Sequence, residues 1–445
     1  MRVSKPLKIN ALAYTIALCA AFTAGAIPAG LVFGVDPYEV FRPTDRTTKI
    51  QDIAEKAHYP LWKLAKYKEG QFDTIILGDS RARSLRDKYW HELGVDNALN
   101  LAYGGGTIPE IYSTFQVIKD DPAVQNLVVG IQLRSFDEDH KGDMNRVPEA
   151  EYIVNNRTEY LKNWSIFKTA WKMMSVEEIE TFDDFDAFAK KFSMAAKADE
   201  LAAMTKFDPS DPQVDVDCFD CDLKSELNRL TVSERYQILD KNLSYRADPN
   251  APIRTSLTIE NWSDVSHLYS TSNTLAPLPK KMANQVTKNA KSDWVGFEFS
   301  PRYWSYITEI SNWAKQNNKN LIFVIPPTIE DMQRSISIYG MEKSSHEFRM
   351  QLAKLGTVID FDYSNELTKQ IDNFSDAYHF KSTIAKKIVG EITGFISVTP
   401  AARKLAIKRS DLISCTPSEN NSESTKIIDE IVLTNVNNCR VWRVL

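Results

Sequence analysis

The chain has 445 residues, of which 43% are hydrophobic and 25% are charged, enough apolar material for one large core or two modest ones. Its formal net charge of -5 argues against a nucleic-acid binder, because such proteins usually carry a basic surface. We therefore expect no nucleic-acid partner.

The first 35 residues differ in composition from the rest of the chain. Arg2, Lys5 and Lys8 precede a run without charge over 9–35, which exceeds the roughly 20 residues needed to cross a bilayer. Cations that precede a span stay in the cytoplasm. We therefore predict a cytoplasmic tail over 1–8, a transmembrane anchor over 9–35, and an extracytoplasmic remainder on the periplasmic side of the inner membrane.

Two alternatives stay open for this segment. A cleaved signal peptide would use the small residues Ala24-Gly25-Ala26, and a lipoprotein would use Cys19. The length of the apolar run favours an uncleaved anchor, and Leu18 disfavours a lipoprotein because a small residue is expected before the cysteine. All three interpretations export the rest of the chain.

Residues 36–70 are predicted to be a helical linker, because apolar residues recur at helical spacing over 47–69. Short apolar runs then alternate with helical segments. Strands are predicted at 72–77, 98–102 and 126–133, and helices at 81–93 and 107–119. The second helix begins with a capping box from Thr107 to Glu110.

The alternation stops over 137–299, which is polar and irregular and is predicted to be a large insertion. It resumes where Ser300 and Pro301 supply N-cap and first-turn chemistry for a helix. That helix is predicted to run to 316, followed by a strand at 321–325, a helix at 345–355, a strand at 357–361 and a helix at 383–396. The remaining segment, 398–445, has two strand-like pieces and is predicted to be a small C-terminal β appendage.

Strands separated by helices favour an α/β fold, with a parallel sheet covered by helices on both faces. The sheet would be assembled from 71–136 and 300–397, on either side of the insertion. Sheets of this kind bind ligands beyond the carboxyl ends of their strands.

The four cysteines beyond the anchor form two local sets, Cys218 with Cys221 and Cys415 with Cys439. An even number suits an oxidising compartment and predicts two structural disulfides. A redox motif at Cys218 and Cys221 is less favoured, because no strand-then-helix pattern surrounds it, and zinc would need a second pair of ligands. We predict no metal and no cofactor.

A second candidate for a cation site is the acidic stretch Asp137-Glu-Asp-His140 with Asp143. Charged runs are usually solvated loops, and this interpretation is preferred here.

Residues that suit nucleophilic catalysis stand at two distant places. Gly78-Asp79-Ser80 follows the first predicted strand, and Asp376-Ala-Tyr-His379 comes near the end of the α/β pattern. A serine at the end of a buried strand, with an Asp and a His three residues apart, supplies a nucleophile, its base and the group that orients the base. Gly-Asp-Ser alone is common in turns and a single His is more often structural, but the ordered combination favours catalysis.

These motifs resemble the first and last sequence blocks of the SGNH (GDSL-like) hydrolase superfamily. The stretch from Asn100 to Thr107 (NLAYGGGT) is similar to the second block, N-x-G-x-x-G-x-T, with Ala102 in place of the first glycine. The resemblance covers the segments 71–136 and 300–397 and implies a flavodoxin-like, three-layer parallel sheet of the SGNH type.

The resemblance also implies roles for individual residues. Ser80 would be the nucleophile, His379 the base and Asp376 the carboxylate that orients the base. The backbone N–H groups of Ser80 and Gly105 would stabilise the oxyanion.

The chain departs from the family in its third block, which normally supplies an Asn as a further oxyanion donor. The segment 130–136 (GIQLRSF) contains no Asn. Either Gln132 or Arg134 takes its place, or the donor is missing.

Single-anchor members of this superfamily resemble the accessory O-acyltransferases of teichoic-acid and alginate modification, which work with a multi-spanning membrane acyltransferase. We therefore expect an acetyl-type O-acyltransferase that modifies a cell-envelope or exported polysaccharide through an acyl-Ser80 intermediate. A polysaccharide O-acetylesterase is the close alternative, because water and a sugar hydroxyl attack the same acyl-enzyme. A non-catalytic envelope scaffold that binds a glycan or a partner is the alternative from another class.

Overall fold

The computed structural model describes residues 26–43, 48–138, 144–180, 229–230, 277–396, 425–428, 431–436 and 439–444. The chain divides into two compact units. The first contains Met1–Gly70 and Pro148–Asp217, and the second contains Gln71–Val147 and Cys218–Leu445.

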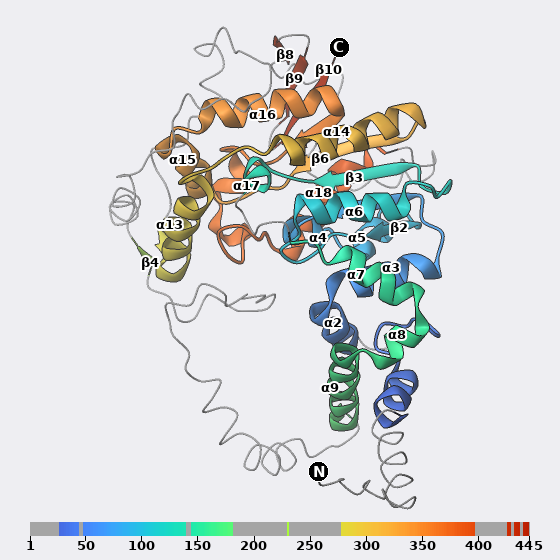
Figure 1. Cartoon of the computed structure of the whole chain (residues 1–445). Helices are drawn as coiled ribbons and strands as arrows, with labels where there is room; N and C mark the ends of the chain where they lie inside the picture. Colours follow the sequence, from blue (N-terminus) through green and yellow to red (C-terminus); the bar gives the residue numbers. More distant parts are fainter. Residues whose placement is uncertain are drawn as a thin grey trace, which may run out of the picture. The chain divides into compact units, whose positions relative to one another are not determined.

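The described part of the first unit is helical (Figure 1). Residues 26–35 form a helix, followed by α2 (Thr48–Ala57), α3 (Tyr59–Glu69), most of α7 (Val147–Asn155), α8 (Arg157–Lys162) and α9 (Trp164–Glu180). The single helix predicted over 47–69 is thus two helices. The break follows from Pro60, which cannot continue a hydrogen-bonded helix, and from His58, whose Nδ1 accepts the Leu61 N–H at 3.2 Å and caps α3.

The second unit is an α/β fold built on a mostly parallel mixed sheet. Its parallel strands are β1 (Thr74–Gly78), β2 (Ala98–Asn100), β3 (Asn126–Gly130), β6 (Asn320–Ile325) and β7 (Thr357–Asp360), in the spatial order β2-β1-β3-β6-β7. The predicted α/β class and parallel pairing are therefore confirmed.

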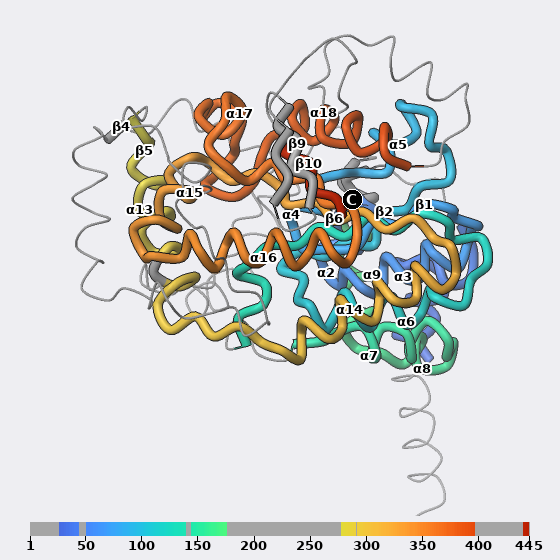
Figure 2. Tube along the Cα trace, turned by 90° about the horizontal axis from the view of Figure 1, so that it is seen from above, coloured from blue at the N-terminus to red at the C-terminus, as the bar shows by residue number. Residues whose placement is uncertain are grey.

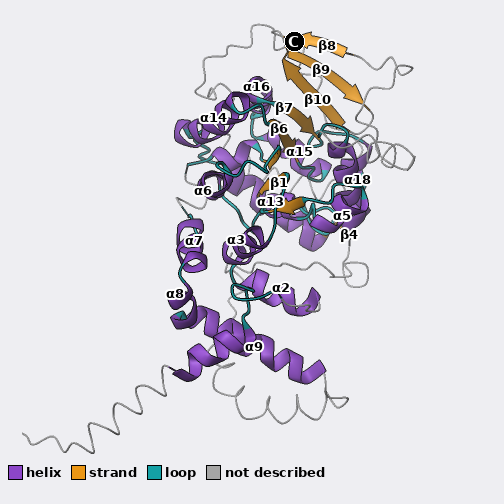
Figure 3. Cartoon of the chain, turned by 90° about the vertical axis from the view of Figure 1, so that its right-hand side faces the viewer, coloured by secondary structure: helices purple, strands orange, loops and turns teal. Residues whose placement is uncertain are grey.

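The C-terminal strands extend this sheet instead of forming a separate appendage (Figure 3). In the part of the chain that the structure describes, β10 (Cys439–Val444) pairs antiparallel with β7, and β9 (Ile431–Val436) and β8 (Thr425–Ile428) follow outward. Without β10 the backbone groups of β7 would form an open edge, and edge strands expose unpaired N–H and C=O groups. Trp442, which is buried, adds side-chain packing at this junction.

Helices cover both faces of the sheet (Figure 2). One face carries α4 (Ser80–Arg83), α5 (Asp87–Glu92) and α18 (Ser382–Thr393), and the other carries α6 (Ile108–Ile118), α14 (Pro301–Gln316) and α16 (Glu342–Leu355). The strands between them contribute fully buried residues such as Ile76, Val128 and Ile322. Smaller elements of this unit are α13 (Lys280–Trp294), α15 (Glu330–Ile338), α17 (Glu366–Lys369), η1 (Leu133–Phe136), η3 (Ile371–Asn373) and the pair β4 (Arg229–Leu230) with β5 (Leu278–Pro279).

Local start signals in the sequence are reproduced closely. Thr107 and Glu110 form the predicted capping box of α6, and Ser300 Oγ accepts the Tyr303 N–H at the start of α14. The helix predicted over 81–93 is instead the two short helices α4 and α5. The region 137–299 contains α9 and α13, which its polar composition did not predict.

Within the described ranges, none of the helices combines the length and hydropathy required to traverse a bilayer. Of the predicted anchor over 9–35, residues 9–25 lie outside those ranges. The anchor therefore stays a prediction.

Candidate active site

Ser80 lies where the chain leaves the sheet at the carboxyl end of β1. It is the first residue of α4, and Asp79 caps that helix by accepting the Arg81 N–H at 2.9 Å. Gly78 has a φ of +146°, and a Cβ at this position would lie 2.6 Å from the carbonyl oxygen of Gly130. Only glycine permits this turn. Ser80 thereby comes to the boundary between β1 and β3, where connections leave the sheet in opposite directions.

Hydrogen bonds link Ser80 to His379 and His379 to Asp376, although Ser80 and His379 are 299 positions apart. Ser80 Oγ lies 2.8 Å from His379 Nε2, and His379 Nδ1 lies 2.7 Å from Asp376 Oδ2. Asp376 Oδ1 also accepts the backbone N–H groups of Tyr378 and His379, both at 2.8 Å. Burial acts to raise the pKa of the Asp376 carboxyl, but its bond and charge interaction with His379 and these N–H groups outweigh burial and lower the pKa. The carboxylate therefore stays ionised beside the imidazole.

The loop that carries Asp376 and His379 is held by neighbouring elements. Inside it, Ala377 donates its N–H to Gln285 Oε1 of α13 at 3.1 Å, and its carbonyl accepts the N–H of Ile329 at 3.2 Å. The position of the His379 imidazole thus depends on α13 and on the segment that precedes α15.

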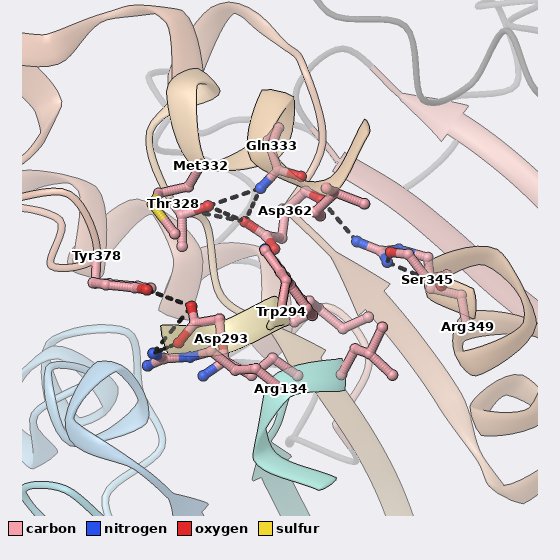
Figure 4. A pocket seen from close by; sticks show the side chains of 14 residues that line it. Arg134, Asp293, Trp294, Thr328, Met332, Gln333, Ser345, Arg349, Asp362 and Tyr378 are labelled. Atoms are coloured by element: carbon pink, nitrogen blue, oxygen red, sulfur yellow. Dashed lines mark hydrogen bonds and ion pairs between the residues drawn. The ribbon is translucent and has the colours of Figure 1, made fainter. Parts of the chain in front are cut away.

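A second link between α13 and this loop passes through Asp293 (Figure 4). The Tyr378 hydroxyl donates to Asp293, whose carboxylate also accepts Arg134 Nη1 at 3.2 Å. The guanidinium carbon of Arg134 lies 4.1 Å from the centre of the Tyr378 ring, within cation–π range. Burial acts to lower the pKa of Arg134, but Asp293 and its neighbours outweigh burial and raise it, so the guanidinium stays charged. These three side chains connect η1, α13 and the loop that carries Asp376 and His379.

Gln132 and Arg134 both line the pocket beside Ser80. Gln132 Nε2 donates to Asp79 Oδ2 at 3.2 Å, and the same oxygen accepts Arg81 Nη2 at 3.2 Å. Burial acts to raise the pKa of Asp79, but the charges of Arg81 and Arg134 outweigh it and lower the pKa. Both residues predicted to take the place of the family Asn therefore reach the pocket, and each of them already donates to a carboxylate.

Asn100 connects the helix after Ser80 with the loop after β2. Its Nδ2 donates to the carbonyls of Ala82 at 2.8 Å and Leu85 at 2.9 Å, and its Oδ1 accepts the Ala102 N–H at 2.9 Å. Asn100 is buried. Asn100 thus holds the loop after β2 against the turn that presents Ser80.

The glycine loop lies against the turn at Ser80. A Cβ at Gly106 would lie 2.7 Å from the carbonyl oxygen of Gly78, so no larger residue fits there without displacement. Gly105, with a φ of +63°, lines one pocket together with Ser80. The volume of this pocket is about 40 Å³, which corresponds to roughly three water-sized positions.

A second pocket, of about 30 Å³, shares Gln132 and Arg134 with the first (Figure 4). It lies beyond the ends of β6 and β7, where Asp362 Oδ1 accepts the N–H and the hydroxyl of Thr328 at 2.8 and 2.7 Å. Burial raises the pKa of the Asp362 carboxyl. Its lining combines Arg134 and Arg349 with Asp293 and Asp362, so charged groups of both signs face one small space.

Other predicted site residues fall mainly outside the described ranges. Cys439 is buried in β10, whereas Cys218, Cys221 and Cys415 lie outside, so both disulfides stay predictions. Of the acidic stretch considered as a cation site, the structure describes Asp137 and Glu138. Asp139, His140 and Asp143 lie outside the described residues. Among the residues that the structure does describe, no group of three His, Cys, Asp or Glu side chains could hold a metal ion.

Sequence reasoning did not identify Gln285 and Asp293, because both lie in the segment predicted to be an irregular insertion. The one available signal was the helical spacing of Met282, Val286 and Ala290, which are buried on one face of α13. That spacing predicts a helix but carries no information about which distant loop its polar residues contact.

Comparison with known proteins adds no family to this description. No protein-family model matches the chain, and no curated protein matches it.

Proposed function

We propose that the second unit is a serine-dependent acyl-ester enzyme of the SGNH type. The observation that carries the proposal is the hydrogen-bonded order Asp376–His379–Ser80, which has the residue types and connectivity of an orienting carboxylate, a base and a nucleophile. The spatial order of the parallel strands supports the same resemblance. If the five parallel strands are numbered 1 to 5 along the chain, their order across the sheet is 2-1-3-4-5. Flavodoxin-like sheets have this order, and their ligands bind at the boundary between strands 1 and 3, where Ser80 lies.

In the first proposed step, Ser80 Oγ attacks the carbonyl carbon of an acyl ester while His379 Nε2 takes the hydroxyl proton. The oxyanion that forms would accept the N–H groups of Ser80 and Gly105. As the first residue of a helix, Ser80 has an N–H without an intrahelical acceptor. The ester C–O bond then breaks, the alcohol leaves with the proton from His379, and acyl-Ser80 remains.

In the second step, a hydroxyl group attacks acyl-Ser80, His379 accepts its proton, and that proton returns to Ser80 Oγ as the new ester departs. Transfer to a hydroxyl of a cell-envelope or exported polysaccharide is the reaction we propose, with hydrolysis by water as the close alternative. The small volume of the pocket beside Ser80, about 40 Å³, supports a short acyl group.

The proposed location follows from the sequence run over 9–35, which would anchor the chain with its N-terminus in the cytoplasm and its catalytic unit outside. An enzyme in this position would need an acyl donor on the outer side of the membrane. A multi-spanning membrane acyltransferase is the proposed partner that supplies it.

The test is covalent labelling of the full-length protein with a fluorophosphonate, which reacts with activated serines. We expect labelling of the wild type, and none of Ser80→Ala. Ser135→Ala is the matched control, because Ser135 lines the same pocket, and it should label like the wild type. Folded protein that shows no Ser80-dependent labelling would overturn the proposal. Turnover of p-nitrophenyl acetate should also exceed that of the octanoate ester.

A non-catalytic scaffold is the second candidate, and one observation favours it. The two side chains that could supply the third oxyanion donor, Gln132 and Arg134, donate instead to Asp79 and Asp293. Specific glycan binding by a Ser80→Ala variant, without any labelling of the wild type, would support this candidate.

A further inference from the structure

Exposed large hydrophobic side chains of the described residues are concentrated in the first unit. Trp164 and Trp171 of α9 are 59% and 56% exposed, and Ile27 and Phe33 of the helix at 26–35 are 69% and 53% exposed. Tyr152 belongs to the same unit. Single exposed hydrophobics are common on protein surfaces, but a group of them usually marks an interaction site.

The aromatic residues of α9 form a continuous row. Phe167 stacks on Trp164 with ring centres 4.7 Å apart, and Trp171 lies 6.3 Å from Phe167 on the next turn. Ile166, Ala170 and Met173 of the same helix are buried. The row is therefore an outer face of α9, additional to the face that packs into the unit.

Lysines accompany this aromatic row and line a groove between α2 and α9. The groove has a volume of about 500 Å³, and Lys56, Lys168 and Lys172 line it together with one acidic residue, Asp52. Three cations against one carboxylate favour an anionic ligand. Lys168 lies four residues after Trp164 and three before Trp171, spacings at which side chains of a helix are neighbours, so cationic and aromatic groups lie side by side on α9.

The helix at 26–35 is tied to α8 and α9 through the turn that follows it. Tyr38 donates its N–H to the Tyr160 hydroxyl at 3.0 Å, and its own hydroxyl lies 3.5 Å from Thr169 Oγ1. Tyr160 in turn donates to Asp36 at 2.9 Å. These buried contacts connect the aromatic row to the end of the uncharged run over 9–35.

We infer that the first unit docks on the surface of an anionic bilayer, with the row Trp164, Phe167 and Trp171 at the lipid interface and a phospholipid phosphate in the α2–α9 groove. Tryptophan and lysine are the residues enriched where protein meets the membrane–water interface, because each combines an apolar body with a polar or charged end. The charge of the groove and its link to an apolar run longer than a bilayer span select a lipid surface over a protein or a free sugar. The inference is independent of the chemistry at Ser80.

The aromatic part is tested with the full chain in nanodiscs made of phosphatidylcholine and phosphatidylglycerol with brominated acyl chains, which quench nearby tryptophans. We expect quenching of the wild-type emission and loss of the quenched component in Trp164→Phe/Trp171→Phe. Trp304→Phe/Trp313→Phe, which changes two tryptophans of the second unit, should keep it. Equal quenching of the wild type and the first variant would overturn the inference.

The groove is tested by native mass spectrometry of the full chain with added phosphatidylglycerol or phosphatidylcholine. Substituting Lys56, Lys168 and Lys172 by Gln should weaken phosphatidylglycerol binding roughly 100-fold, from the usual contribution of each lysine near an anionic surface. A charge-matched control replaces Lys162, Lys280 and Lys288, which are exposed and outside the groove, and should bind like the wild type. Equal binding of both triple variants, or displacement of the lipid by an equal concentration of inorganic phosphate, would contradict a lipid site. Fluorophosphonate labelling of the groove variant should match the wild type, so the two proposals fail separately.

Discussion

Replacing Asp293 by Asn tests whether α13 holds the loop that carries Asp376 and His379. The Asp293 side chain is 2% exposed, and it pairs with Arg134, which is 19% exposed, while it accepts the Tyr378 hydroxyl. Removing its charge leaves a mostly buried guanidinium without a carboxylate, which costs about 3 kcal/mol in comparable buried pairs. For a folding unit of a few hundred residues we expect Tm to fall by roughly 6–10 °C.

The same change should slow the proposed reaction at Ser80, because His379 sits one residue after Tyr378. A displacement of about 1 Å at a reacting group lowers a rate by roughly 100-fold. Thermal unfolding followed by circular dichroism and the second-order rate of fluorophosphonate labelling measure the two effects. Glu366→Gln is the control, since this exposed carboxylate pairs with the exposed Lys369, and a surface ion pair contributes at most about 1 kcal/mol. If Asp293→Asn behaves like Glu366→Gln in both assays, α13 does not position the loop.

The remaining predictions concern the turn at Ser80 and its partners. Because the folded-state pKa of Asp376 lies below its usual value, its carboxylate stabilises the fold above the unfolded-state pKa, and this contribution is lost as pH falls through the folded-state pKa. Urea unfolding at pH 7 and pH 3 should therefore show a larger acid-induced loss for the wild type than for Asp376→Asn, and equal losses would contradict the assignment. Asn100→Ala leaves the Ala102 N–H without its acceptor and removes one of the donors to the Ala82 and Leu85 carbonyls, which keep the Leu85 N–H and the Trp90 Nε1–H, and should lower the free energy of unfolding by about 1–3 kcal/mol; a change below the error of the urea titration would contradict this role of Asn100. Gly106→Ala places a Cβ against the Gly78 carbonyl and should cost about 1–3 kcal/mol with slower labelling, whereas Gly34→Ala, which meets no atom within 4 Å, should not lower Tm.

Local features of the fold could be predicted because their causes lie within a few residues of each other. The Thr107–Glu110 capping box and the Ser300–Pro301 helix start depend on side chains that bond to the next turn, and both occur as expected. The parallel strands were recognisable because strands buried on both faces are apolar throughout. The edge position of β10 was not recognisable, since a strand that joins a sheet edge differs little in sequence from one that forms a separate hairpin.

For the candidate site, the residue types could be read from the sequence: a Gly-Asp-Ser at the end of a strand, and an Asp and a His three residues apart. The need for glycine at position 78 was visible only in the structure, where its φ is +146° and a Cβ would collide with the Gly130 carbonyl oxygen. Two contacts became visible in the folded structure alone: Ser80 Oγ lies within hydrogen-bond distance of His379 Nε2, and Asp293 contacts Arg134 from 159 positions away. Such pairs leave no periodic trace in the sequence, because the distance between them depends on how the whole sheet and its covering helices pack.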